Sequence, residues 1–133
     1  MIKLFVFKVN EVKFALSIDV IISICDGKDI EISDIPKEKG YIRGISYIRD
    51  EVYTVIDMSY YLYNRYTNGK IYILVMLGNK LYALVVDEVD GIIEVTEESK
   101  IEVSSVIKDS KILYHIYRNK EIISILNIKE LGD

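Results

Sequence analysis

The chain has 133 residues, half of them apolar, and a net charge of −4 from 17 basic and 21 acidic side chains. This length fits one compact domain, and the charge balance lacks the clustered positive surface that a nucleic-acid backbone requires. The single cysteine, Cys25, excludes an intrachain disulfide and favours a reducing cytoplasm. No stretch approaches the about 20 apolar residues of a membrane helix, so we expect a cytoplasmic protein without membrane insertion.

Alternating apolar residues separated by turn residues predict four β-hairpins in chain order. Ile, Val and Tyr dominate the apolar residues, and such β-branched and aromatic side chains suit a pleated sheet. The polar segment 62–70 predicts a linker, opened by a short helix over 57–62. The predicted hairpins span residues 5–18, 44–56, 71–86 and 112–126.

Three segments of the first half match segments about 70 residues further along, in the same order. The matched pairs are Phe14–Asp19 with Tyr82–Asp87, Ile30–Lys37 with Ile101–Lys108, and Tyr47–Asp57 with Tyr117–Asn127. The alternative explanation is that strands of similar composition resemble one another.

A duplicated half predicts an all-β fold of two five-stranded antiparallel β-barrels packed together, with one or two short helical turns. The first barrel is expected over about residues 12–66 and the second over about 70–131, with exchange of the N-terminal strand between them. Residues 71–77 are apolar on both strand faces, which favours a place between the barrels.

No motif predicts catalysis, a metal site or a cofactor. His115 is the only histidine and has no sequence-evident partner, and Cys25 lacks a neighbouring base. The acidic run 87–91 fails as a calcium loop, because aligning Gly91 with the sixth position puts Val86 at the first. One aromatic and basic cluster favours helix packing, with base stacking as the alternative: Tyr60, Tyr61, Tyr63, Arg65 and Tyr66.

The chain resembles the CheW family, whose members couple chemoreceptors to the histidine kinase CheA in bacterial chemotaxis. Residues 41–58, running from Tyr-Ile-Arg-Gly to Val-Ile-Asp-Met, resemble its signature block, and Leu84–Val89 resembles a second one. Residues 5–24 and 122–131 resemble the opening hairpin and the closing strand. The family fold, two SH3-like five-stranded barrels, agrees with the duplication. The chain departs from the family at Tyr47, Asp50 and Thr54, where Asn, Gly and Pro are usual.

The resemblance implies site residues. Kinase-binding residues would be Ile18, Ile21, Ile22 and Ser23, and receptor- or partner-binding residues would be Arg43, Gly44 and Arg49. Consecutive Ile21 and Ile22 cannot both face the core of an extended segment; either one is exposed as an anchor, or both lie between the barrels. Asp57 and Asp87 are expected to be structural, with Asp57 capping the following helical turn.

The implied partners are the regulatory domain of a CheA-type kinase and the cytoplasmic tip of a methyl-accepting chemoreceptor. We therefore expect a non-catalytic scaffold without cofactor or metal, monomeric alone, and recruited from the cytoplasm to receptor arrays at the inner face of the membrane. The alternatives are a CheW-like adaptor in a non-chemotaxis pathway and a small barrel that binds peptide or RNA.

Overall fold

The computed structural model describes residues 1–102 and 111–132, and most of them are in β-strands. One short helix, α1 (Met58–Tyr63), and single 3₁₀ turns connect the strands. The strands are β1 (Ile2–Val9), β2 (Val12–Ser17), β3 (Ile21–Asp26), β4 (Ile42–Ile48), β5 (Glu51–Asp57), β6 (Ile71–Leu77), β7 (Lys80–Val86), β8 (Glu88–Val95), β9 (Lys100–Glu102), β10 (Ile112–Arg118) and β11 (Glu121–Leu126).

The four predicted hairpins are present, and tight turns close them. At three of the turns both central residues have a positive φ between 50° and 68°. Two-residue turns of this kind match the twist of the flanking strands, which keeps each hairpin in register. The six residues with this backbone are Asn10, Glu11, Arg49, Asp50, Asn119 and Lys120.

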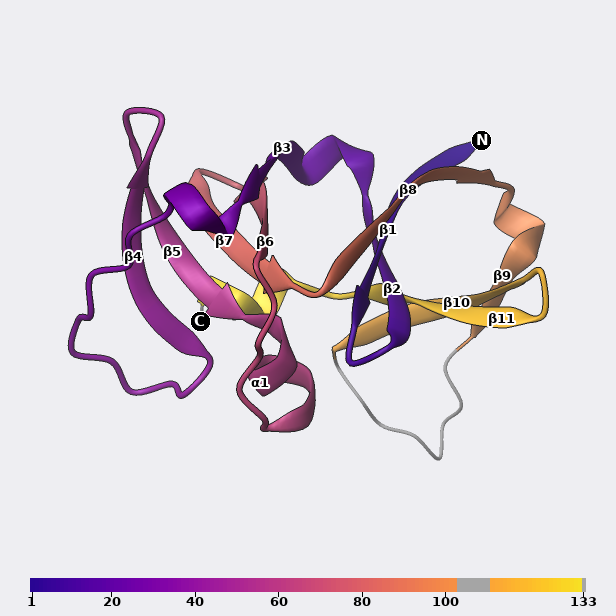
Figure 1. The fold of residues 1–133 in the computed structure, drawn as a ribbon. Helices are drawn as coiled ribbons and strands as arrows, with labels where there is room; N and C mark the ends of the chain where they lie inside the picture. Colours follow the sequence, from indigo (N-terminus) through magenta and orange to yellow (C-terminus); the bar gives the residue numbers. More distant parts are fainter. Residues whose placement is uncertain (103–110, 133) are drawn as a thin grey trace.

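The strands form two sheets that lie side by side, with α1 below the joint between them (Figure 1). The first has six strands in the order β8-β1-β2-β11-β10-β9, and the second has five in the order β3-β6-β7-β5-β4. The all-β prediction of two paired barrels is confirmed. Each sheet is mixed, because two antiparallel hairpins meet along a parallel pair, β2 with β11 and β7 with β5.

The repeat is visible in the strand registers. Phe14 pairs with Ser124 in one barrel, and Tyr82 pairs with Thr54 in the other. The sequence repeat matches Phe14 with Tyr82 and Thr54 with Ser124, so the two pairs are equivalent. The predicted match of Ile30 with Ile101 is wrong by three residues. Ser33 bridges Ile45 in the way that Ile101 pairs with His115, so Ser33 is the residue equivalent to Ile101. Residues 103–108 of that matched block lie outside the described residues.

Each barrel is built from both halves of the chain, which differs from the expected boundaries near residues 12–66 and 70–131. The six-stranded barrel combines residues 2–17 with 88–126, and the five-stranded barrel comprises residues 21–86. The exchanged element is therefore a hairpin, β1–β2 or β6–β7, rather than one N-terminal strand. In a duplicated chain both copies present the same strand edges, so sequence pattern does not decide which copy supplies the partner.

Three apolar cores follow from strand alternation. One fills each barrel, around Val6 and Ala15 in the first and Leu74 and Ala83 in the second. The third and largest lies between the barrels. The strand over 71–77 serves two of these cores, as predicted, because Leu74 points into its own barrel and Ile73 points to the shared core. Both side chains are fully buried, which stabilises the fold by about 1.5–3 kcal/mol each.

Gly44 is required by backbone geometry. It follows a bulge in β4 and has φ of +145°, and a Cβ there would lie 2.2 Å from the carbonyl oxygen of Ser33. That close approach allows Ser33 and Ile45 to exchange two backbone hydrogen bonds of 2.8 and 3.0 Å. Gly44 thus lets the segment before β4 pair along its edge.

We expect Gly44→Ala to lower the free energy of unfolding by more than about 2 kcal/mol, because the methyl group meets backbone at a strained φ. Gly91→Ala is the matched control, since Gly91 also has a positive φ of +113° but nothing lies within 4 Å of its added Cβ. Urea unfolding of both variants measures the difference. Equal losses of unfolding free energy in the two variants would show that the positive φ alone makes Gly44 necessary, and that its close approach to Ser33 does not contribute.

Candidate functional site

The strand β3 presents apolar side chains to solvent. A bulge between Ile21 and Ser23 leaves Ile22 outside the ladder with β6. Ile22 is 44% exposed and Ile24 is 40% exposed, whereas Ile21 and Ile18 are partly buried and pack against the shared core. The two consecutive isoleucines therefore point differently, and Ile22 is the one available to a partner.

Arg49 lies beside β3 although 26 residues separate it from Ser23. Its Nη1 donates a 2.6 Å hydrogen bond to Ser23 Oγ, so two residues assigned to different partners from sequence lie together. A hollow of about 390 Å³ separates β3 from the β4–β5 turn, and Ile24, Tyr47 and Arg49 line it. We call the group Ile22, Ser23, Ile24, Tyr47 and Arg49 the β3 surface.

Behind this surface, Tyr53 anchors the strand that follows the Arg49 turn. Burial raises the pKa of the Tyr53 phenol, and the nearby Glu51 carboxylate raises it further, while Arg49 opposes the shift. The phenol is therefore neutral at physiological pH, and the charge of the β3 surface comes from Arg49 and the neighbouring acidic residues.

Arg43 and Gly44 do not join the β3 surface, because they lie at the other end of β4 from Arg49. The Arg43 Nη1 atom lies 3.5 Å from Oδ2 of Asp57, a carboxylate that is fully buried. Asp57 is the N-cap of α1, since its Oδ1 accepts from Tyr60 N at 3.1 Å and its Oδ2 accepts from Thr67 N at 3.1 Å. Arg43 and Gly44 thus support the local backbone and the cap.

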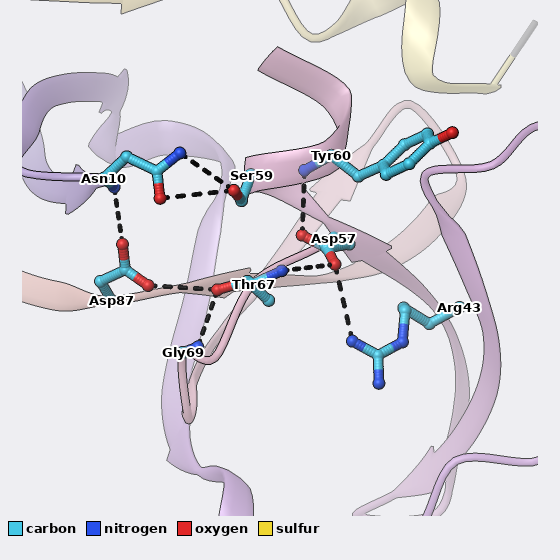
Figure 2. A network of polar contacts seen from close by, with 8 residues as sticks. All are labelled: Asn10, Arg43, Asp57, Ser59, Tyr60, Thr67, Gly69 and Asp87. Atoms are coloured by element: carbon cyan, nitrogen blue, oxygen red, sulfur yellow. Dashed lines mark hydrogen bonds and ion pairs between the residues drawn. The ribbon is translucent and has the colours of Figure 1, made fainter. Parts of the chain in front are cut away.

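Asp87 lies in the same polar network, where the chain passes from β7 to β8 (Figure 2). Its Oδ2 accepts from Asn10 N at 2.6 Å, and its Oδ1 accepts from the Thr67 hydroxyl at 3.1 Å. The Asn10 side-chain amide reaches Ser59 Oγ at 3.1 Å. Asp57 and Asp87 are therefore tied through Thr67 to the turn of the first hairpin.

The aromatic cluster on and after α1 packs within the protein. Tyr60 and Tyr66 stack on each other at 4.7 Å between ring centroids, and Tyr61 meets Tyr41 edge-on at 5.0 Å. Tyr63 packs edge-on against Phe14 at 6.4 Å. These contacts place α1 against both barrels, and Tyr66 keeps 68% of its surface exposed.

An apolar cavity of about 420 Å³ lies between the barrels, and sequence analysis did not identify it. We call it the inter-barrel cavity. Its walls come from β1, β2, η1 (Ile18–Val20), the end of β6 with the following turn, β10, and the end of β11 with the segment after it. Lining residues include Leu16, Val20, Met76, Leu77, Leu113 and Ile128. No pattern in the sequence groups residues that are brought together only when two barrels pack.

Among residues 1–102 and 111–132, no group of three His, Cys, Asp or Glu side chains is arranged to hold a metal ion. The His115 Nδ1 atom lies 2.8 Å from Ser124 Oγ on the neighbouring strand, and Cys25 is half-buried beside the β3 surface. None of the helices among the described residues has the length and apolarity of a membrane span.

Comparison with known proteins decides the family. The family model described as a CheW-like domain matches residues 3–133. The chain belongs to the CheW-like family. A solved structure, the scaffolding protein TtCheW from Thermoanaerobacter tengcongensis, superposes with a TM-score of 0.82 at 24% identity, over 95% of this chain and 88% of that one. No curated protein matches.

Family membership makes this CheW-like chain a non-catalytic scaffolding domain. The paired barrels agree with the fold of TtCheW, and protein partners are the ligands of such a scaffold. Among the described residues, the exposed isoleucines of the β3 surface and the inter-barrel cavity are apolar features open to solvent.

Proposed function

We propose that this CheW-like chain couples chemoreceptors to a CheA-type histidine kinase in bacterial chemotaxis. The kinase's regulatory domain docks on the β3 surface, and the cytoplasmic receptor tip docks in the inter-barrel cavity. The chain acts in the cytoplasm and is recruited to receptor arrays at the inner face of the membrane.

The observation that carries the proposal is the exposed position of Ile22 in its bulge beside the Arg49–Ser23 hydrogen bond. An exposed isoleucine next to a bonded arginine combines an apolar contact with a directed cation, and arginine is among the residues enriched where binding energy concentrates. Ile18 and Ile21 pack against the shared core, so they support the backbone of this surface from behind and Ile22 makes the contact.

The cavity supports a second partner. Its lining is mostly aliphatic, and an open apolar cavity of this size can bury several side chains of a partner segment. The cavity and the β3 surface are lined by different residues, so the two partners do not compete for the same contacts. Simultaneous binding raises the effective concentration of kinase at the receptor without new chemistry.

We expect Ile22→Asp to weaken binding of the kinase's regulatory domain at least tenfold, because it places a charge at the centre of the docking surface. The equivalent bulge residue in the other barrel is Asp90, so the fold accommodates aspartate there. Isothermal titration gives the affinity. The matched control is Ile92→Asp, an exposed isoleucine of the other barrel, and equal weakening by both would reject the β3 surface.

Arg49→Ala is expected to weaken the same complex about tenfold, while the free energy of unfolding changes by less than about 0.5 kcal/mol because the Arg49–Ser23 contact is exposed. Arg118→Ala, an exposed arginine beside the corresponding turn of the other barrel, is the control. Binding and urea unfolding are measured on the same samples. An unchanged affinity would remove Arg49 from the docking surface.

Leu113→Arg is expected to weaken receptor-tip binding at least tenfold and to leave kinase binding unchanged, because it puts a cation at the mouth of the apolar cavity. Leu113 occupies the bulge position equivalent to Arg43, so arginine is compatible with the backbone. Co-sedimentation with receptor-containing vesicles measures binding. The control is Ile101→Arg on β9. Retained receptor binding in Leu113→Arg would place the receptor elsewhere.

A further inference from the structure

The approximate two-fold between the barrels creates two equivalent junctions where the barrels meet. One junction contains α1 and the polar network of Figure 2, and the other contains the inter-barrel cavity. The registers and the sequence repeat relate their residues. The equivalent pairs, with the α1 junction first, are Asn10 and Gly78, Arg43 and Leu113, Asp57 and Asn127, Ser59 and Lys129, and Asp87 and Asp19.

At the α1 junction the polar groups form a closed ring. Thr67 joins the two carboxylates, with its N–H donating to Asp57 at 3.1 Å and its hydroxyl donating to Asp87 at 3.1 Å. Asp87 accepts from Asn10 N at 2.6 Å, and Asn10 bonds Ser59 at 3.1 Å. Ser59 lies in α1, two residues after the N-cap Asp57, so the backbone between these residues closes the ring.

The ring crosses from one barrel to the other. Asn10 is in the β1–β2 turn of the six-stranded barrel, whereas Ser59 and Thr67 lie between β5 and β6 of the five-stranded barrel. A second bond crosses nearby, since Lys111 Nζ, just before β10, donates to Tyr61 O at 2.9 Å. Directed hydrogen bonds at this junction therefore restrain how the barrels are turned relative to each other.

At the other junction Asn127 also caps the turn that follows it, since its Oδ1 accepts from Lys129 N at 3.3 Å, but other positions of the ring carry different residues. Glycine stands at the position of Asn10 and leucine at that of Arg43, and the side chain of Asp19 is exposed to solvent. Leu113 and Gly78 instead line the apolar cavity. The two copies of the repeat have thus diverged at one place, into a polar ring on one side and an open apolar space on the other.

We infer that the ring of Asn10, Asp57, Ser59, Thr67 and Asp87 is a clasp that sets the angle between the barrels and, through it, the width of the inter-barrel cavity. The shared apolar core holds the barrels together but is non-directional, so it tolerates small rotations. Hydrogen bonds in a partly buried network depend on angle and distance and strengthen one another. Asn10 and Thr67 are positioning residues in this arrangement.

The inference concerns the shape of the molecule and does not require the proposed function. It is tested by electron spin resonance distances between labels on the two barrels, placed at Tyr47→Cys and Tyr117→Cys in a Cys25→Ala background. Both tyrosines are exposed, equivalent strand positions. Asn10→Gly copies the other junction and suits the positive φ of 51° at this position, and Thr67→Val removes the hydroxyl.

We expect Asn10→Gly and Thr67→Val to broaden the distance distribution about twofold, because the barrels then sample several angles. Thr67→Ser, which keeps the hydroxyl, and Asp19→Asn, the equivalent aspartate of the other junction, should match the parent. Where either test variant fails to fold, Ser59→Ala replaces it under the same criterion. If the folded Asn10→Gly and Thr67→Val variants gave the same distance distribution as the parent protein, the inference would be overturned. The ring would then be only a local stabilising contact.

Discussion

The structure depends on an exchange of hairpins between the two copies of its repeat. β1–β2 completes the barrel formed by β8–β11, and β6–β7 completes the barrel that contains β3–β5. Each exchanged hairpin buries both of its faces, one inside a barrel and one in the shared core. This requirement explains the apolar strands, such as 71–77, because only a strand with two buried faces is apolar throughout.

The repeat places equivalent strand positions in both barrels, and the side chains at some of these positions differ. The β3 bulge carries Ile22 where the β8 bulge carries Asp90, and Asp90 bonds Lys13 at 3.1 Å in an ion-paired group with Glu121. These two carboxylates raise the pKa of Lys13. The β3 bulge thus exposes an apolar side chain, whereas the side chain at the β8 bulge is ion-paired with a residue of its own barrel. The junctions between the barrels have diverged in the same way.

Much of the fold could be predicted from local pattern. Alternation and turn residues gave the four hairpins, and the matched segments gave the repeat, because both signals reside in neighbouring residues. The exchange of hairpins could not be predicted, since Phe14 and Tyr82 present similar edges and either copy could supply the partner. The helix after Asp57 was predictable because an aspartate before a short amphipathic segment is a common N-cap.

The candidate site was predictable only in part. The resemblance pointed to Ile22, Ser23 and Arg49, but assigned them to different partners, whereas the structure brings Ser23 and Arg49 within hydrogen-bond distance. Strand geometry required the side chains of Ile21 and Ile22 to point in different directions, but it did not say which of them is exposed. The bulge in β3 determines that Ile22 is the exposed one. The cavity had no sequence signal, because its lining residues come from five separate stretches of the chain.

The hairpin exchange also makes the two halves of the chain depend on each other. A fragment that ended at the linker after α1 would contain β3–β5 without β6–β7, and β1–β2 without the strands that surround them. To close a sheet, each half would have to turn its own hairpin into the place that the exchanged hairpin fills in the structure; otherwise its apolar edges would be open to intermolecular pairing. In the observed arrangement each barrel therefore depends on a hairpin from the other half of the chain, so a change in one half reaches both barrels.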